Sequence, residues 1–542
     1  MPGTLAFILA LVVTMTILPL LARMAGSLGV LDPPGGRKLH AAPVPRVGGL
    51  AMALGVVIAA VATLQLRGPD GWFLLAVGVL VAFGVWDDRI DLDYRIKLVG
   101  QLLAVAIVVL WGDVRIRTVT LDDSIVLPDW VSLPLTVVFL LGITNAINLA
   151  DGLDGLAGGT TFLSLCALAV LSHMTGAAGS APLLLAFAGA VLGFLRFNTY
   201  PASVFMGDAG SQLLGFSLGV LAIRATQNDA TQMSAAIPVL VLALPILDTL
   251  SVIVHRINEG RSPFKADNNH IHHKLLALGF AHHEAVMVVY AAQAALFIAA
   301  YLLRYESDLL ILAVVTGFFA VTVAALQLAA RAGWRVRPAG VVRERRDPLG
   351  RAAQLASLAK AAIAAALAGY AVLVVFEMSQ PSNDVRLLVA GLLCAIVGFA
   401  AIMRVAPLGL PEKCVLFVTA AVLVYLDVSQ AHPDPLLSWA RWACIGVAGL
   451  ATAIRLRLLN DRRFQVTPLD LIILFMALVV PNLPGSLALP SGGSAAIAKL
   501  IVVLYAIEVL VSRTDRRVLW FRVGAASVLA GLAVRSLSFT WG

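Results

Sequence analysis

Charged residues are scarce in this sequence, and their scarcity excludes an ordinary soluble protein. Asp, Glu, Lys and Arg make up 13% of the 542 residues, whereas 60% are hydrophobic. A soluble globular domain carries roughly twice that charged fraction. Apolar runs near 20 residues recur along the chain, and about 18 are long enough to cross a bilayer. The sequence therefore predicts an all-α polytopic membrane protein, because a bilayer offers irregular backbone no hydrogen-bond partners.

Metal-binding patterns of the zinc type are also missing. The four cysteines (Cys166, Cys394, Cys414 and Cys444) lie in or beside apolar runs, and none belongs to a CxxC pair. We expect them to be buried thiols that pack as small apolar groups. No HExxH pattern occurs either, so a zinc site is not indicated.

Basic residues are distributed unevenly between the two sides of the predicted membrane. They gather after odd-numbered apolar runs, as in 331–346, 455–463 and 513–517, and the net charge is +8. By the positive-inside rule these loops are cytoplasmic, and the first run, 4–21, is a retained span with the N-terminus outside. The net positive charge therefore does not indicate nucleic-acid binding.

Two modules are expected. Residues 1–330 contain eleven predicted spans, and residues 331–351 form a basic linker rich in Gly and Pro. Residues 352–542 contain about seven more spans. Their polar loops are short and lack carboxylate or histidine clusters, so the role of this second module stays open.

Five polar segments hold nearly all the groups that could carry chemistry, and each follows an odd-numbered span. Odd parity places them on the same, cytoplasmic face of the membrane. They are residues 32–49, 87–95, 145–155, 198–211 and 255–274.

Carboxylates are concentrated in three of these segments. Asp87, Asp88 and Asp91 lie within five residues at a span end, and such a cluster repels itself unless a cation or proton compensates. Mg²⁺ prefers a few carboxylates together with substrate phosphate oxygens. The alternative is a solvated helix end neutralised by Arg89 and Arg95.

Asn148, Asp151 and Asp154 recur every three residues, so one turn of helix would present them together. A helix break with a capping Asp is the alternative, but it does not explain so many polar groups at membrane depth. Asp208 lies between glycines before another apolar run. It could be a plain helix cap, or it could hold a metal against substrate phosphates.

Histidines and other basic residues fill the remaining two segments. His270, His272 and His273 fall within four residues, near Arg261, and together with Arg and Lys they suit diphosphate binding better than zinc. The first segment, with Lys38, His40 and Arg46, is the most basic. A positive-inside signal would account for its charge but not for its Pro and Gly residues.

Taken together, the five segments resemble the polyprenyl-phosphate N-acetylhexosamine-1-phosphate transferase family. The matching patterns are R-K-x-H-x-x-P-x-P-R-x-G-G (37–49), D-D-x-x-D (87–91), N-x-x-D-G-x-D-G-L-A (148–157), N-x-x-P-A-x-x-F-M-G-D-A-G-S (198–211) and H-I-H-H (270–273). The resemblance covers about residues 1–330 and does not extend to the remainder.

The resemblance implies the role of each segment. Members of the family move a sugar-1-phosphate from a UDP-sugar to a membrane polyprenyl phosphate and use Mg²⁺, which Mn²⁺ can replace. Asp208 is the best-matching metal ligand, with Asp88 beside it. Asp87 and Asp88 would deprotonate or position the lipid phosphate. Asn148, Asp151 and Asp154 would bind the nucleotide-sugar and the metal, with Asp151 and Asp154 counted among the catalytic residues. The expected substrate-binding residues are Lys38, His40, Arg46, Asn148, Asn198, Arg261, His270, His272 and His273.

The resemblance also bears on the substrate and the location. Family members that take UDP-MurNAc-pentapeptide typically have three consecutive histidines, and Ile271 interrupts that run. UDP-GlcNAc or a close relative is therefore expected, with undecaprenyl phosphate as acceptor in a bacterial inner membrane. The product would start a lipid-linked glycan such as O-antigen or teichoic acid. Direct attack and a covalent phospho-aspartate both remain open.

Three other functions are compatible with the sequence. One is the phospho-MurNAc-pentapeptide translocase activity of peptidoglycan synthesis. Another is a proton-coupled transporter, although the carboxylates lie at span ends and no inverted repeat is visible. The third is an inactive relative that serves as an assembly platform. A homodimer is compatible with each of them.

Overall fold

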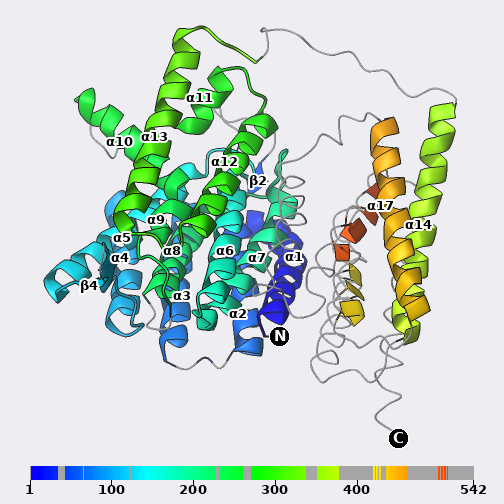
Figure 1. The fold of residues 1–542 in the computed structure, drawn as a ribbon, viewed down its shortest axis with the longest axis horizontal. Helices are drawn as coiled ribbons and strands as arrows, with labels where there is room; N and C mark the ends of the chain where they lie inside the picture. Colours follow the sequence, from blue (N-terminus) through cyan, green and yellow to red (C-terminus); the bar gives the residue numbers. More distant parts are fainter. Residues whose placement is uncertain are drawn as a thin grey trace, which may run out of the picture. The chain divides into compact units, whose positions relative to one another are not determined.

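Helices dominate the computed structural model, and two short two-stranded hairpins are the sheet structure among the residues that it describes (Figure 1). The described residues are 2–33, 43–64, 66, 68–121, 124–227, 231–260, 270–336, 351–377, 419–420, 423–424, 426–428, 435–459, 499–500, 502–504, 506–507 and 509–510. The predicted all-α class of a polytopic membrane protein is confirmed.

The chain divides into two compact units. The first runs from Met1 to Val342, and the second takes most of the chain from Arg343 onward. In the first unit the elements are α1 (Pro2–Leu28), β1 (Leu31–Asp32), β2 (Val44–Pro45), α2 (Gly48–Thr63), α3 (Pro69–Ile90), α4 (Tyr94–Leu110), β3 (Thr118–Thr120), β4 (Ser124–Val126), α5 (Asp129–Ala150), α6 (Leu156–Met174), η1 (Ala178–Ser180), α7 (Ala181–Asn198), α8 (Gly207–Thr226), α9 (Ile237–Val241), α10 (Ala243–Asn258), α11 (Ile271–Ala277), α12 (His282–Leu302) and α13 (Asp308–Arg331).

Nine of the described helices are long and apolar enough to cross a membrane. Seven of them belong to the first unit, and shorter helices such as α2 and α4 lie between them. The predicted total of about 18 spans includes segments outside the described residues, so that total, the eleven-plus-seven division and the outward N-terminus stay predictions.

Helices α6 and α8 form the centre of the first unit. Both are buried along almost their whole length, and α8 packs against α2, α3, α5 and α6 (Figure 1). Helix α13, by contrast, exposes apolar side chains such as Leu309, Val321 and Leu328. Such a surface suits a helix that faces lipid, where no apolar burial against protein is required.

Close backbone contacts set the position of the α8 N-terminus. A Cβ atom on Gly84 of α3 would lie 2.3 Å from the Cα of Ala209, and one on Gly49 of α2 would lie 2.2 Å from the backbone nitrogen of Gly210. Only glycine permits these approaches, because any side chain would push the helices apart. The start of α8 is therefore held between α2 and α3.

The second unit is described mainly by α14 (Arg351–Glu377) and α17 (Pro435–Leu459), which pack against each other. Small residues make that contact, among them Ala359, Ala366, Ala448 and Ala451. Cys444 lies half-buried in this unit and Cys166 is buried in the first, as expected of thiols that pack as apolar groups; Cys394 and Cys414 fall outside the described residues.

Candidate active site

Asp208 occupies the first turn of α8, and its surroundings come from three other helices. The backbone N–H groups of Asp208 and Ala209 donate to Oδ1 and Oδ2 of Asp88, at 2.8 and 3.1 Å. Gly207 has φ +69°, and a Cβ there would lie 2.3 Å from the Asp88 carboxylate. Asp88 thus binds the N-terminus of α8, where free N–H groups favour a negative charge.

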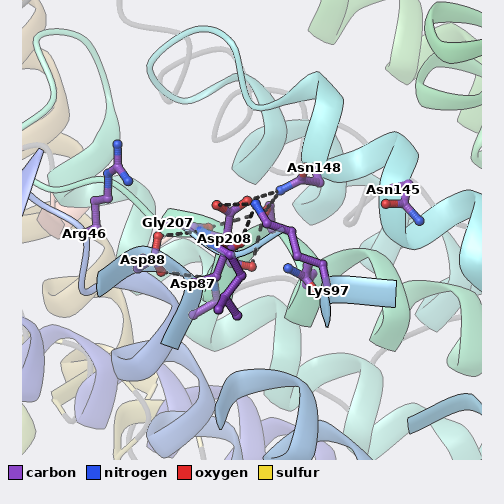
Figure 2. Close-up of polar contacts among 12 residues, drawn as sticks. Arg46, Asp87, Asp88, Lys97, Asn145, Asn148, Gly207 and Asp208 are labelled. Atoms are coloured by element: carbon purple, nitrogen blue, oxygen red, sulfur yellow. Dashed lines mark hydrogen bonds and ion pairs between the residues drawn. The ribbon is translucent and has the colours of Figure 1, made fainter. Parts of the chain in front are cut away.

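Lys97 of α4 lies between two of the carboxylates (Figure 2). Its Nζ is 2.7 Å from Oδ2 of Asp87 and 3.7 Å from Oδ2 of Asp208. Oδ1 of Asp87 accepts the backbone N–H of Leu92 at 2.8 Å, directly after the turn at which α3 ends. Asp87 is buried and Asp91, which has φ 54°, is exposed, so the structure separates the members of the D-D-x-x-D pattern.

Asn148 of α5 completes the surroundings of Asp208. Its Nδ2 donates to Oδ1 of Asp208 at 2.6 Å and to Oγ of Ser211 at 2.7 Å. The second oxygen of Asp208, Oδ2, lies 3.7 Å from Nζ of Lys97. The hydrogen bond to Oδ1 thereby orients Asp208, while Oδ2 faces the ammonium group of Lys97.

The expectation that one helical turn carries Asn148, Asp151 and Asp154 together is wrong. Helix α5 ends at Ala150, residues 151–155 form a turn, and α6 begins at Leu156. Oδ2 of Asp154 points to the fourth segment and accepts the backbone N–H of Ala202 at 2.9 Å. Gly155, with φ +81°, ends the turn, because its backbone conformation is one that ordinary side chains avoid.

Asp151 remains close to the other acidic groups. Burial raises the pKa of Asp151 to about 7, and the charges of Asp208, Asp154 and Asp88 add to that effect. The cause is the usual one, since both desolvation and like charges disfavour an ionised carboxyl. A cation near Asp151 would relieve both costs.

Asn198 links two loops instead of lying open to the site. Its Oδ1 accepts the backbone N–H of Gly155 at 2.9 Å, and its Nδ2 donates to the carbonyl of Val204 at 3.0 Å. The side chain is buried. This geometry makes Asn198 a brace between the third and fourth segments, and its predicted contact with substrate stays a prediction.

The histidine segment reaches the same region through Asp248 of α10. Oδ2 of Asp248 lies 2.8 Å from Nδ1 of His270, and Oδ1 accepts the backbone N–H of Ile271 at 2.7 Å. These two contacts hold the start of α11. The rings of His272 and His273 are in contact in a tilted arrangement, with centroids 4.3 Å apart.

His272 packs on the turn that carries the acidic residues. A Cβ on Gly152 would lie 2.3 Å from Nε2 of His272, so only glycine leaves room for the ring. Burial lowers the pKa of His272 to about 4, and the charge of His273 contributes in the same direction. Burial therefore favours the neutral form of the His272 ring, and its predicted contact with substrate phosphates stays a prediction.

The first segment joins the fourth through its backbone. Phe205 donates its N–H to the carbonyl of Pro45 at 2.8 Å, and Gly49 donates to Met206 at 2.9 Å. Arg46 forms an ion pair with Asp32. The predicted residues Lys38, His40 and Arg261 lie outside the described residues.

Three residues of this region were missed by reading the sequence. Lys97 is a lone cation near the start of an apolar run, and Asp248 is a lone carboxylate inside one. Ionisable groups in such places are costly and often functional, which is a signal that could have found both. Gln212, one turn after Asp208, carries no charge and offered no comparable signal.

The five segments thus meet at one end of the first unit and form an acidic site that contains a lysine and histidines. Within the described ranges, no three His, Cys, Asp or Glu side chains are grouped closely enough to hold a metal ion by themselves. These features define the class as a polytopic membrane protein with a carboxylate-rich site at the ends of its helices.

Comparison with known proteins places the chain more narrowly. Residues 71–226 match the model of glycosyl transferase family 4. The chain is 37% identical over 290 residues to a probable undecaprenyl-phosphate N-acetylglucosaminyl 1-phosphate transferase of Bacillus subtilis (strain 168), covering 53% of this chain and 80% of that protein. The chain belongs to glycosyl transferase family 4 and is a phosphotransferase of that family.

Other relatives match the same part of the chain. A decaprenyl-phosphate N-acetylglucosaminephosphotransferase of Mycolicibacterium smegmatis is 36% identical, covering 48% of this chain and 72% of the relative. An undecaprenyl-phosphate alpha-N-acetylglucosaminyl 1-phosphate transferase of Escherichia coli (strain K12) is 28% identical, covering 51% of this chain and 76% of the relative. Each match spans about half of this chain.

Proposed function

We propose that the protein transfers N-acetylglucosamine-1-phosphate from UDP-GlcNAc to a polyprenyl phosphate, releasing UMP. The observation that supports this most strongly is the position of Lys97 between Asp87 and Asp208, with Asp88 bound to the backbone of Asp208, in a family of phosphotransferases. Relatives whose names specify an N-acetylglucosaminyl phosphate transfer to undecaprenyl or decaprenyl phosphate support the choice of sugar and lipid.

The residues around Asp208 suit a magnesium ion. Mg²⁺ is usually held by one or two carboxylates together with waters and substrate phosphates, so a group of three protein ligands is not required. Asp208 and Asp151 are the carboxylates that would hold it. When bound, Mg²⁺ would offset the charge of a diphosphate and of the leaving UMP.

The chain's own groups would do the remaining work. Lys97 lies between Asp87 and Asp208 and would bind phosphate oxygens. Asp87 would accept a proton from the lipid phosphate or orient it, and Asp88 would hold the start of α8. His270, held by Asp248, would bind the nucleotide diphosphate from the opposite side.

The location of the site follows from the same proposal. We place it on the cytoplasmic side of a bacterial inner membrane, because UDP-sugars are made in the cytoplasm and basic loops favour that side. Cysteines introduced near Leu39 and Gly260 should react with an impermeant reagent only after the membrane is permeabilised. Labelling in intact cells would reverse the topology.

A radiolabelled assay in membranes tests the activity. With UDP-GlcNAc and polyprenyl phosphate we expect release of UMP and a butanol-soluble labelled lipid, both abolished by EDTA and restored by MgCl₂. A transporter or an inactive platform would release no UMP. Equal activity with UDP-MurNAc-pentapeptide would contradict the assignment of the sugar.

The role of Asp208 has its own test within this assay. Asp208→Asn keeps an oxygen that can accept from Asn148 but loses the charge, so we expect a fall in turnover of about 100-fold or more while the detergent-purified protein stays folded. Near wild-type turnover in that variant would contradict the metal-ligand assignment.

A further inference from the structure

Three amide side chains join the helices of the site one turn farther from the carboxylates. Nδ2 of Asn145 on α5 donates to Oε1 of Gln101 on α4 at 2.9 Å, and Nε2 of Gln101 donates back to Oδ1 of Asn145 at 3.4 Å. Nε2 of Gln101 also lies 3.4 Å from Oε1 of Gln212 on α8. We refer to Gln101, Asn145 and Gln212 as the amide layer.

The amide layer and the site use the same faces of the same helices. Side chains three or four residues apart lie next to each other on a helix. The pairs are Lys97 and Gln101 on α4, Asn148 and Asn145 on α5, and Asp208 and Gln212 on α8. Figure 2 shows Asn145 beyond Asn148, farther from Asp208.

Two polar contacts of the site join α4 and α5 to Asp208 of α8. Lys97 and Asp208 are 3.7 Å apart, and Asn148 supplies the hydrogen bond from α5 to Asp208. Both contacts involve groups that a substrate or metal would engage. The amide layer, in contrast, leaves its bonds intact while the site is occupied, because its members bond to one another.

The choice of amides is itself informative. Gln101 and Gln212 are buried, and burying an amide is costly unless it is hydrogen-bonded. Apolar side chains would hold the helices together equally well but would allow them to slide. Amides bond at one distance and direction, so a layer of them sets the register of neighbouring helices.

We propose that the amide layer is a positioning device that holds α4, α5 and α8 in the register required by Lys97, Asn148 and Asp208. The proposal rests on the function proposed above. Gln101 is the centre of the layer because it contacts both other members. The three amides are positioning residues, since they act through the side chains one turn away.

Asn145 offers the cleanest test, because it is exposed on α5 and leucine there replaces no buried side chain. In the full-length protein, Asn145→Leu and Gln101→Leu should lower kcat about 10-fold, as expected for reacting groups that are misplaced. KM for UDP-GlcNAc should stay within about twofold of wild type, since the layer touches no substrate. Val138→Leu, also exposed on α5, is the control and should match wild type.

A swap of the two amides distinguishes positioning from general damage. The double variant Gln101→Asn with Asn145→Gln keeps the combined length of the Gln101–Asn145 pair but gives up the contact to Gln212, so it should recover part of the lost kcat. Failure of the swap to recover kcat would overturn the proposal, as would wild-type kcat in both leucine variants. A lower unfolding temperature with unchanged kcat would assign the layer to stability alone and would also overturn it.

UMP release by the wild-type protein distinguishes a failure of the proposed function from a failure of the positioning role. If the wild type releases no UMP from UDP-GlcNAc, the proposed function fails. If the wild type is active and the leucine variants equal it, the function stands and the positioning role of the amide layer fails.

Discussion

At the scale of single residues, each carboxylate of the site has a different partner. Asp87 pairs with a lysine, Asp88 with backbone N–H groups, and Asp154 with a neighbouring loop. Asp151 and Asp208 keep the most capacity for a cation. The surroundings of each aspartate therefore decide whether its carboxylate bonds to the protein itself or stays able to bind a cation.

Asp248 is the residue-scale prediction. It binds both His270 and the backbone of Ile271, so Asp248→Ala should let the histidine segment move away from the acidic turn. We expect kcat/KM for UDP-GlcNAc to fall about 10-fold or more. Ser251→Ala on the same helix is the control, because Oγ of Ser251 donates to the backbone carbonyl of Asp248 within its own helix. An unchanged kcat/KM for Asp248→Ala would show that His270 does not need this anchor.

At the scale of elements, close helix contacts position the start of α8. Gly84 of α3 and Gly49 of α2 allow backbone contact that a larger residue would prevent. The same helix start holds Asp208 and receives Asp88. The close packing at Gly84 and Gly49 thus also determines where Asp208 lies relative to Asp88.

Two glycines on one helix test that arrangement. Gly84→Ala places a Cβ 2.3 Å from the Cα of Ala209 and should shift α8, lowering turnover about 10-fold or more. Gly78→Ala lies on the same helix with nothing within 4 Å, so it should retain turnover and leave stability equal or slightly higher. Turnover and thermal unfolding of both variants are to be measured in detergent. Equal turnover in the two would mean that the close contact does not position Asp208.

The second unit contains a buried charged cluster that its loops did not reveal. Asp427 pairs with Lys499 and with Arg441 and accepts a hydrogen bond from Tyr370 at 2.9 Å. All four side chains are buried. The sequence expectation concerned the polar loops of this module, which lie mostly outside the described residues, whereas this cluster lies in the interior of the unit.

Removing Asp427 tests what the cluster does. Asp427→Ala leaves Lys499 and Arg441 buried without that carboxylate, which should destabilise the second unit by about 3–5 kcal/mol. Faster proteolysis at sites after Arg343 would report this, with Ser357→Ala on the surface of α14 as control. Release of UMP should stay near wild type. A stable second unit in Asp427→Ala would show that the cluster is not needed for folding.

At the scale of the whole molecule, the chain joins a family domain to a second membrane unit. The described site residues all lie in the first unit, which ends at Val342. The family match and the relatives account for about half of the chain.

The corresponding prediction is that residues 1–345 suffice for catalysis. This truncation is expressed alone and shown to be inserted and monodisperse. It should release UMP at a rate within about tenfold of the full chain, because it retains every described residue of the proposed site. A well-inserted but inactive truncation would show that the later spans support the site. The full-length protein under the same conditions is the control.

The sequence by itself determined the class of protein and the place of its site. Scarce charge and repeated apolar runs require membrane spans, and the predicted odd parity assigns the five polar segments to one face, which stays a prediction. The H-I-H-H and carboxylate patterns indicated the family. These properties follow from composition and order along the chain, so no distances were needed to find them.

Only the tertiary structure decided which groups meet. The lysine between Asp87 and Asp208, the bond from Asp88 to α8 and the amide layer join residues far apart in sequence. The three-residue spacing of Asn148, Asp151 and Asp154 likewise did not show that the helix ends at Ala150 and separates Asp154 from Asn148. Such contacts depend on how helices pack and rotate against one another, and helix packing is set by side-chain volumes and glycine contacts across the whole bundle rather than by local spacing.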